Sequence, residues 1–558
     1  MKARLPLTLI AAFVALCAIA KAVAPAPTEP RRQSSQRITL LHTDQLYKDP
    51  QVSRTGQVLV GNVRFLHDGV ILTCDSALYF EATNSFDAFG HVKMNQHDTL
   101  TLVSDVLFYD GSDQMARARY NVVLTHRDTK LYCDSLDYDR LYDLGYFFNG
   151  GKLIDKENTL TSYWGQYQPP TRQAVFNYNV ELKNPNFTLV SDTLHYNTAT
   201  GMAHIVGPSN IDSGDNHIWS ANGTYDTHAD RAHLLDRSVV TNKGTTITGD
   251  SLDYTSTGSL SKAFGNVVYT DVVNKNMFTG NYCLYSDSTG YAEAADSALC
   301  IDFSQRDTMF IHADTFKLIT YNIDTDTMWR EMRAYNRVRA WRKDLQAVCD
   351  SMVYKSIDSC LTLYRDPILW QQGQQLLGEE IRTWMNDSTM DSTHVLRQAL
   401  SVERIDSLCY NQVSSNVMRS YFTPEGQMRM SVAEGNVLVN YYPFDEDSLM
   451  VGLNHLETTQ LKLFMDSGKV KRLWAAGGDG TLHPIMLIPE GERFLDNFAW
   501  FDYIRPLSKA DCFVWRGKKE GTGLKESVRH EAPKQRLGEP RSSSAAAKPK
   551  KGRQQAQQ

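Results

Sequence analysis

Five Asp residues recur in one sequence setting, and acidic side chains at regular spacing are one way in which proteins hold calcium. Each follows a small residue, and together they are Asp75, Asp105, Asp134, Asp192 and Asp250. Calcium-binding β-solenoids carry dense Asp within Gly-rich nonapeptides. Here the recurring segments supply one Asp per 29 or so residues, so an Asp that hydrogen-bonds nearby backbone at a chain corner is the better interpretation.

The cysteines are the next candidates for chemistry. The chain has nine Cys, and Cys74, Cys133 and Cys349 occupy one place in the recurring segment, where other copies have Ser or Gly. Interchange with Ser and Gly indicates a small buried residue rather than a nucleophile. The spacing matches no zinc pattern. Disulfides are compatible with export, but the sequence cannot pair them.

Other reactive residue types form no recognisable constellation. Five histidines lie close in sequence without the spacing of a ligand set, and we expect them on surfaces and turns: His195, His204, His217, His228 and His233. The run Gly477–Gly480 lacks the Lys-Ser/Thr of a phosphate loop, and no Ser elbow is found. We predict no catalytic residue, no cofactor and no metal site. A few dispersed Asp can still build a glycosidase or lyase on a β-helix, which keeps an enzyme open as an alternative.

A repeat of 29 to 31 residues positions all these side chains. Its clearest copy is Thr246–Tyr254, and the closing aromatic recurs as Tyr79, Tyr109, Tyr138, Tyr167, Tyr196, Tyr225, Tyr254 and Tyr285. A period this steady predicts one supersecondary unit stacked on itself. No long helical period appears in this region.

A large apolar residue stands seven places before each of these tyrosines. The eight residues are Leu72, Leu102, Leu131, Leu160, Leu189, Ile218, Ile247 and Phe278. Strand side chains alternate between faces, yet this position and the Tyr differ by an odd step. We therefore predict a bend or bulge at the small residue and the Asp after it, so that both halves face one interior. A second strand follows each Tyr, with inward pairs such as Ala88 and Val92.

The chain divides into segments of different composition. Residues 1–24 have the basic start, apolar run and small-residue site of a signal peptide, and residues 25–37 form a polar linker. Regular repeats occupy residues 38–300, and looser repeats with insertions extend over 301–484. The aromatic segment 485–514 is predicted to cap the open end of the stack, because a solenoid must cover its last strand edge.

Residues 515–558 form a basic tail that we expect to be disordered, because it has almost no apolar residue to bury. It holds twelve Lys and Arg against four Glu, a charge of +8 that leaves −14 for the rest of a chain whose net charge is −6. Such a tail either contacts an anionic membrane surface or keeps the protein soluble. Export argues against nucleic acid as its partner.

The repeated segments resemble the OstA-like (organic solvent tolerance) proteins, relatives of the periplasmic lipopolysaccharide-transport bridge. The matching segments are Cys74–Tyr79 with Ala88–Val92, and Gly249–Tyr254 with Ala263–Val267. The resemblance implies an all-β, elongated, stacked-repeat β-jelly-roll, an open V-shaped solenoid of antiparallel strands. It implies that the eight apolar residues line a groove for acyl chains, whereas without the resemblance such a stripe inside a solenoid is more often plain core. The chain is longer than the usual bridge subunit and carries the basic tail.

Two classes of function follow from the sequence. The first is a non-enzymatic periplasmic carrier of lipopolysaccharide or a related glycolipid, associated with the outer membrane and joined to other lipid-transport components by β-strand edge pairing. The second is an exported β-helical surface protein or polysaccharide-active enzyme. Strand direction separates the two folds, because a β-helix is parallel and a jelly roll is antiparallel. The sequence alone does not fix it.

Overall fold

The computed structural model describes residues 36–96, 99–255, 260–304, 307–371, 373–386, 389–447, 449–466, 469–519 and 522. The predicted signal peptide, nearly all of the linker and most of the basic tail lie outside the described residues. Within the described part of the chain, no helix has the length and apolar character needed to cross a bilayer.

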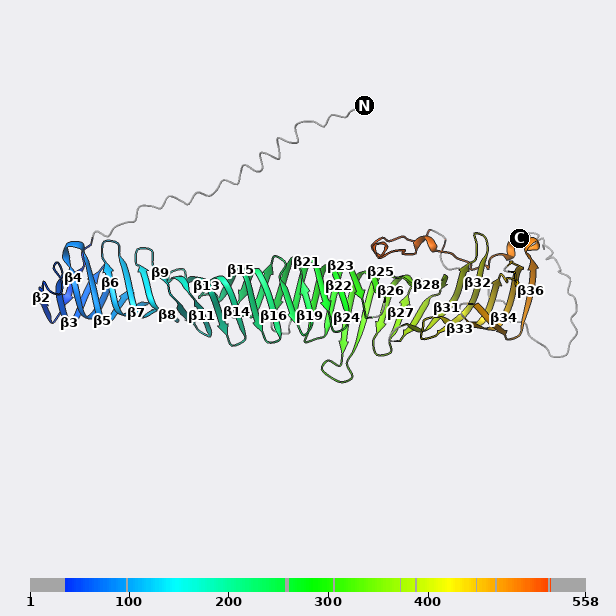
Figure 1. Ribbon diagram of the computed structural model, residues 1–558, viewed down its shortest axis with the longest axis horizontal. Coiled ribbons are helices and arrows are strands. Elements are labelled where there is room, and N and C mark those ends of the chain that lie inside the picture. The colour runs from blue at the N-terminus through cyan, green and yellow to red at the C-terminus, as the bar shows by residue number, and fades with distance from the viewer. Residues whose placement is uncertain are drawn as a thin grey trace, which may run out of the picture. The chain divides into compact units, whose positions relative to one another are not determined.

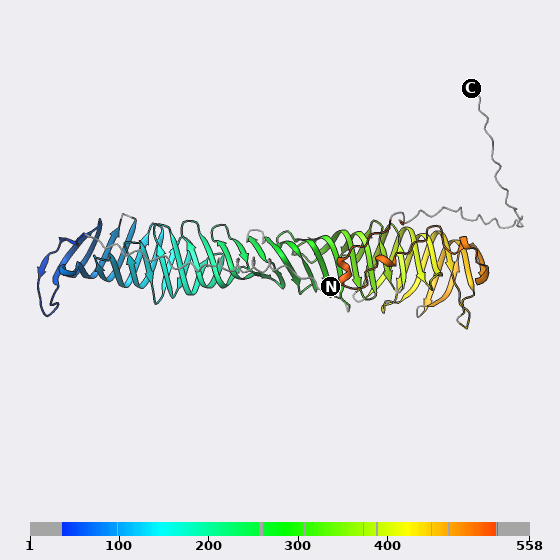
Figure 2. The ribbon, with the colours of Figure 1, turned by 90° about the horizontal axis from the view of Figure 1, so that it is seen from above.

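The chain forms two compact units. Unit 1 comprises the described residues of Met1–Lys243 and Ser251–Thr257, and unit 2 those of Gly244–Asp250 and Gly258–Gln558. Both units are all-β, and within each the strands follow one another in chain order (Figures 1 and 2).

Ten of the strands of unit 1 are 11 or 12 residues long, and the other nine have 3 to 5 residues. They are β1 (Thr39–His42), β2 (Gln45–Tyr47), β3 (Gln57–His67), β4 (Val70–Phe80), β5 (Ser85–Gln96), β6 (Leu100–Asp110), β7 (Met115–His126), β8 (Thr129–Asp139), β9 (Leu144–Phe147), β10 (Gly151–Asp155), β11 (Asn158–Ser162), β12 (Trp164–Gln168), β13 (Gln173–Asn184), β14 (Phe187–Asn197), β15 (Met202–Ser213), β16 (Asn216–Asp226), β17 (Arg231–Leu235), β18 (Val239–Asn242) and β20 (Ser251–Thr255), with the 3₁₀ turn η1 (Glu81–Thr83).

Unit 2 continues the pattern and ends in short 3₁₀ turns. Its elements are β19 (Thr245–Thr248), β21 (Leu260–Asp271), β22 (Asn276–Ser286), β23 (Tyr291–Asp302), β24 (Met309–Tyr321), β25 (Trp329–Arg342), β26 (Leu345–Lys355), β27 (Cys360–Tyr364), β28 (Ile368–Gln371), β29 (Gln374–Leu377), β30 (Glu380–Met385), β31 (Met390–Arg404), β32 (Tyr410–Phe422), β33 (Met428–Tyr441), β34 (Gly452–Asp466), β35 (Lys469–Ala475), β36 (Gly478–Pro484), η2 (Ile485–Leu487), η3 (Glu490–Glu492), η4 (Asp502–Ile504) and η5 (Ala510–Phe513).

Strand pairing in each unit is antiparallel. The hairpin β3–β4 pairs with β5, which pairs with β6 and so on through unit 1, and β24 to β26 pair in the same way in unit 2. The predicted all-β stacked repeat is therefore confirmed as the antiparallel form. A parallel β-helix, the fold of the rival interpretation, is excluded.

The strands that carry the small residue and the Asp bend there, as the sequence predicts. In β4, Val70, Leu72 and Cys74 face inward, then the alternation breaks and Ala77 faces inward. Opposite the break, Val60 pairs with Ser76 and Val63 with Cys74, so two residues of β3 face the single Asp75. The extra residue thus lies in the neighbouring strand, not in the strand that carries the Asp.

The two bulged residues have left-handed backbone, which explains the Gly of the second strand. In β5 they are Gly90 (φ 72°) and His91 (φ 42°). A Cβ atom on Gly90 would lie 2.5 Å from Asp75 Oδ2, so this glycine is required by its φ angle and by the carboxylate beside it. Gly265 meets Asp250 at the same distance. The Gly and the Asp therefore belong to one corner built from two strands.

The recurring Asp side chains bond to the bulged residue of the neighbouring strand. Asp105 Oδ2 accepts from Asn121 Nδ2 at 2.7 Å, Asp250 Oδ2 accepts from Asn266 Nδ2 at 2.8 Å, and Asp75 Oδ2 lies 2.7 Å from His91 Nδ1. We expected backbone groups as the partners; the hydrogen bonds seen here go to side chains. The corner role of the Asp residues holds at these three corners.

The bend divides the strands into two arms. Arm A holds the residues on the side of the predicted apolar stripe, such as Val70–Cys74, and arm B those on the side of the recurring Tyr, such as Ser76–Phe80. The inward residues of both arms form the core. Ala88 and Val92, the predicted inward pair, are 0% and 1% exposed.

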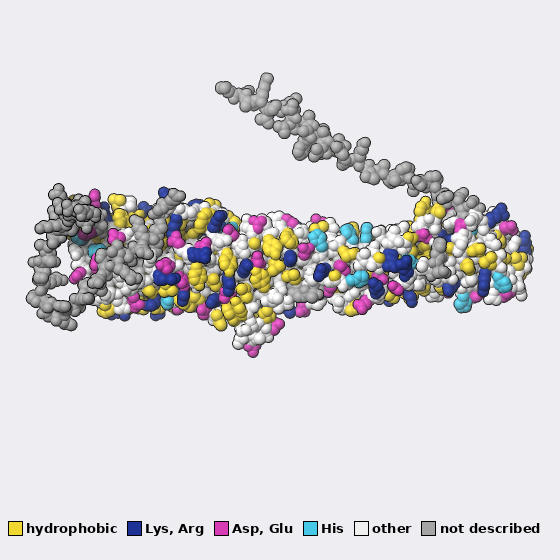
Figure 3. Space-filling view, turned by 180° about the vertical axis from the view of Figure 1, so that it is seen from behind, with side chains coloured by type: hydrophobic (Ala, Val, Ile, Leu, Met, Phe, Trp, Pro, Cys, Tyr) yellow, Lys and Arg dark blue, Asp and Glu magenta, His cyan; other side chains and the backbone are white. Residues whose placement is uncertain are grey.

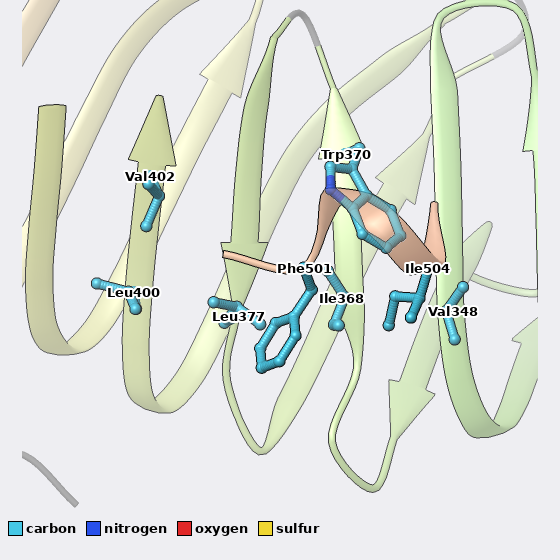
Figure 4. Packing of buried hydrophobic residues seen from close by; sticks show 8 residues of the cluster. All are labelled: Val348, Ile368, Trp370, Leu377, Leu400, Val402, Phe501 and Ile504. Carbon is cyan, nitrogen blue, oxygen red and sulfur yellow. The ribbon is translucent and has the colours of Figure 1, made fainter. Parts of the chain in front are cut away.

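In unit 2 a third layer covers the outer face of arm A. Residues 492–515, which we call the C-terminal strap, place Phe501 and Ile504 against the outward side chains Val348, Ile368 and Leu377 (Figure 4). Cys349 occupies the inward repeat position of Cys74. Val348 precedes it and therefore points outward, because neighbouring residues of a strand point to opposite faces. The strap makes up most of the segment predicted as an end cap, and it lies along a face of the sheet.

Two buried glutamines fix the strap. Gln375 Nε2 donates to the Ala499 carbonyl at 2.9 Å, and its Oε1 accepts from the Phe501 amide at 2.7 Å. Gln412 repeats the arrangement with Arg493 and Leu495. Each glutamine side chain therefore makes the hydrogen bonds to the strap backbone that a neighbouring strand would make in a sheet.

Candidate functional site

The eight residues predicted to line a groove all point into the interior between the arms. Leu72, Leu102, Leu131, Leu160, Leu189 and Ile218 lie in unit 1, Ile247 and Phe278 lie in unit 2, and their exposure runs from 0% to 9%. They occupy the inward face of arm A at one level of the repeat, as the spacing predicts.

The arms of unit 1 touch across this interior. The rings of Phe65 in arm A and Phe86 in arm B stack with centroids 4.2 Å apart, and those of Phe187 and Tyr225 lie 4.5 Å apart. The void beside Leu72 measures ≈ 10 Å³, which is no larger than one water needs. The interior around Leu72 is therefore packed as a core.

A ladder of polar residues runs along the free edge of arm A in unit 1, near the turns between hairpins. Its members recur every 29 or 30 residues and are His67, Gln96, His126, Asp155, Asn184, Ser213 and Asn242. All except Asn184 are buried. We call this set the edge ladder. Buried polar groups need partners, and the recurring tyrosines supply several of them.

The tyrosines join the two arms at this edge. Tyr109 Oη of arm B lies 2.7 Å from His67 Nδ1, and Tyr167 Oη lies 2.9 Å from His126 Nδ1. Tyr196 donates to Asp155 Oδ2 at 2.8 Å. Each bond joins an edge-ladder residue to the Tyr 41 or 42 positions later. These bonds form a seam that closes the opening between the arms of unit 1.

The two His–Tyr bonds of the seam join neutral groups. Burial lowers the pKa values of His67 and His126, which favours their uncharged rings. Burial is also the main cause that raises the pKa of Tyr109 to about 12, so its hydroxyl keeps its proton. Arg140 brings a positive charge and donates to Tyr109 Oη and to the His67 carbonyl. Such bonds hold the arms together and can part without separating an ion pair.

Sequence reasoning missed the edge ladder although its signal is present. The repeat is defined in the sequence by its apolar stripe and its Tyr. The same 29-residue period carries polar residues at the end of the second strand. A buried polar position with the period of the core predicts a cross-arm hydrogen bond in each repeat.

The interior of unit 2 contains an apolar cavity between the arms of β31–β35. Its volume is ≈ 110 Å³. Val413, Val439 and Leu456 of arm A face Met418, Leu461 and Leu463 of arm B across it. This is more than ten times the void at Leu72, so the arms here leave room for an apolar group.

The other chemistry-bearing residues have structural surroundings. Burial raises the pKa values of the Cys74 and Cys133 thiols to about 12, so both stay protonated and poor nucleophiles. The five histidines expected on surfaces are all exposed. Among the described residues, no group of three or more His, Cys, Asp or Glu is placed to hold a metal ion.

Comparison with known proteins gives one assignment. Residues 35–192 match the family of OstA-like proteins. No curated protein matches the chain. The matched residues span β1 to β13 and most of β14, where the corners and the seam are found. The similarity to OstA-like proteins thus covers residues 35–192.

Proposed function

We propose that this protein is a non-enzymatic periplasmic carrier that holds the acyl chains of lipopolysaccharide or a related glycolipid between its two arms. The observation that carries the proposal is the cavity between the arms of β31–β35, where apolar side chains of both arms, such as Val439 and Leu463, lie among polar ones. A transport role for the OstA-like family supports it. Transfer of hydrocarbon from water to an apolar wall lowers the free energy.

The two units take different parts in this function. The cavity of unit 2 accepts the first apolar groups, whereas unit 1 admits a chain once the seam at Tyr109, Tyr167 and Tyr196 opens. The six stripe residues of unit 1 become the floor of its opened groove. Lipid covers the apolar surface of the open groove and so stabilises the open state. When the lipid leaves, the seam closes again.

We place the partners at the ends of the strand order. β1 and β2 both pair with β3, and β35 and β36 both pair with β34. An end strand offers unpaired backbone groups to a further strand. Other lipid-transport components dock there by edge pairing, and the carrier passes its lipid toward the outer membrane.

Photo-crosslinking in living cells tests the carrier. A photoreactive residue is placed at Leu102, Leu189 or Ile218, and at the adjacent outward positions Val103, Val190 and Trp219, which are 38–45% exposed. We expect lipopolysaccharide adducts from the inward set and few from the outward set. Met418 and Leu463 should give adducts most readily.

The outcome against the proposal is equally plain. If the protein is expressed normally and no inward position of either unit gives a lipid adduct, the interior carries no lipid. Equal adducts from Leu189 and Val190 indicate lipid on the outside of the sheet.

A further inference from the structure

A hollow on unit 2 lies outside the interior, along the bend of β25–β31. Its volume is ≈ 760 Å³, within the range of small-molecule sites. Tyr335, Ser351 and Tyr364 line it from arm B, and corner residues such as Asn336 and Gln398 complete it. These side chains point outward, because the neighbouring Ala334 and Leu363 are buried in the core. We call it the corner groove.

Broken strands make the groove. β27 ends at Tyr364 and β28 begins at Ile368, while β29 ends at Leu377 and β30 begins at Glu380. Gly378 lies in the second break, where a Cβ atom would come 2.5 Å from Val395 Cγ1. Gly378 therefore has no room for a side chain and lines the groove with backbone alone.

The charged groups of the groove are already paired. Arg365 Nη1 lies 3.2 Å from Asp350 Oδ2, Arg397 Nε lies 3.0 Å from Glu379 Oε2, and Asp366 is paired with Lys518. A ligand here meets planar polar groups that can donate and accept hydrogen bonds, with their charges balanced. The site therefore favours an uncharged ligand rich in hydroxyl groups.

The two tyrosines add flat apolar surfaces at a defined interval. Tyr335 pairs with Ser351, which pairs with Tyr364, so the tyrosines stand in one row with a single strand between them. Two strand spacings separate them by about 9.6 Å. Aromatic rings with a polar tip are suited to a ligand that has an apolar face and a polar rim, which describes a pyranose ring.

The same outer face carries further aromatic residues. Hydrophobic side chains gather beside the projecting turn between β24 and β25 (Figure 3). There the rings of Tyr321 and Trp329 stack with centroids 4.2 Å apart, and Met328 is 49% exposed. A chain of sugar rings that leaves the groove over arm B meets aromatic surface again.

We propose that the corner groove binds a neutral oligosaccharide, with Tyr335 and Tyr364 stacking on alternate rings and Asn336, Gln398 and Ser351 bonding the hydroxyl groups. This site is separate from the acyl-chain interior and does not depend on the carrier function. A surface glycan and the neutral sugars of a glycolipid share the chemistry that it recognises.

Calorimetric titration of the mature full-length protein tests the site with maltohexaose, chitohexaose and mannohexaose, none of which carries an acyl chain. At least one should bind saturably. Tyr335→Ala should weaken it roughly 3- to 10-fold, and Tyr335→Phe should keep most of the affinity because it retains the ring. The control is Tyr163→Ala, which removes a 55%-exposed Tyr at a strand break of unit 1.

Three results overturn the proposal. The first is that none of the three sugars saturates the protein, and the second is that Tyr335→Ala and Tyr364→Ala bind as the native chain does. The third is that a photoreactive residue at Ser351 in cells crosslinks a protein and no glycan, which makes the groove a protein-docking site. None of these results bears on lipid adducts from the interior, so the two proposals fail separately.

Discussion

The outer face of arm A differs between the two units although its repeat position is the same. Val190 in unit 1 and Val348 in unit 2 both lie next to the small residue at the bend, and both point outward. Val190 is 45% exposed, whereas Val348 is 6% exposed beneath the strap. The residue type is identical, so the additional layer makes the difference.

The inward faces of the units are alike by contrast. Leu189 in unit 1 and Ala347 in unit 2 precede the outward Val, and both are buried. The repeat therefore fixes what faces the interior, while the outward residues are free to distinguish one unit from the other. In unit 2 they accept a third layer, and at the bend they line a groove.

The same substitution at the two outward valines should give the largest contrast. Val348→Asp buries a carboxylate against Phe501 and Ile504 with no partner, at a cost of several kcal/mol (roughly 2–7). Val190→Asp leaves the charge in water and should change stability by less than about 0.5 kcal/mol. Hydrogen exchange resolved by peptide measures both. Equal loss of protection would mean that the strap does not cover Val348.

Removal of one strap side chain should have the next largest effect. Phe501 is 2% exposed, and Phe501→Ala should destabilise the strap by about 3–5 kcal/mol. Faster exchange is expected over residues 492–515 and β26–β31, with unit 1 unchanged. The matched control is Phe513→Ala, because Phe513 is 51% exposed on the same strap. Unchanged exchange in Phe501→Ala would show that the glutamine bonds suffice.

Much of the interior was predictable from the sequence because it repeats. Leu131 and Ala118 lie on regular strands whose period places every inward side chain, and the odd step before Tyr138 required a bend. The seam was within reach for the same reason, since His126 and Tyr167 each belong to a periodic set.

The strap was beyond this kind of reasoning. Phe501 and Val348 are far apart in sequence, and their contact depends on a segment with no period of its own. One local sign exists in Ile368-Leu369-Trp370, a strand apolar on both faces. Such a run indicates a strand covered on both sides, but it does not say which segment covers it. The cavity and the corner groove depend on side-chain packing, which spacing alone does not determine.

Weakening the seam should open the interior of unit 1 to lipid, as we propose for the cavity of unit 2. Tyr109→Phe removes the hydroxyl that His67 and Arg140 contact, and leaves these buried groups short of a partner at a cost of about 1–3 kcal/mol. We expect faster exchange at the edge of β3 and more lipid adducts from a photoreactive Leu102. Tyr120→Phe is the control, since Tyr120 is 64% exposed. Fewer adducts from the loosened variant would contradict the opening of unit 1.

The end of the strap should lose stability in acid. Burial and the neighbouring Arg339 lower the pKa of His312 to about 4, and Arg339 donates to the Cys512 carbonyl. An unfolded His titrates near 6.5, so the folded form binds fewer protons between pH 6.5 and 4. Stability of this region should therefore fall as pH decreases through that range. Exchange of residues 505–515 measures it, and His312→Phe should flatten the response.

The smallest effect is expected at Cys133, and it tests whether the bend position is structural throughout. Ser104 and Ser191 hold the same place in neighbouring repeats, and each donates a hydroxyl bond to the carbonyl two residues later. Cys133→Ser can make that bond with Ser135, so its free energy of unfolding should change by less than about 1 kcal/mol. Burial raises the thiol pKa to about 12, so little thiolate is available for chemistry. Denaturant unfolding and lipid crosslinking should both match the native chain, whereas a severe defect would assign the thiol a reactive role.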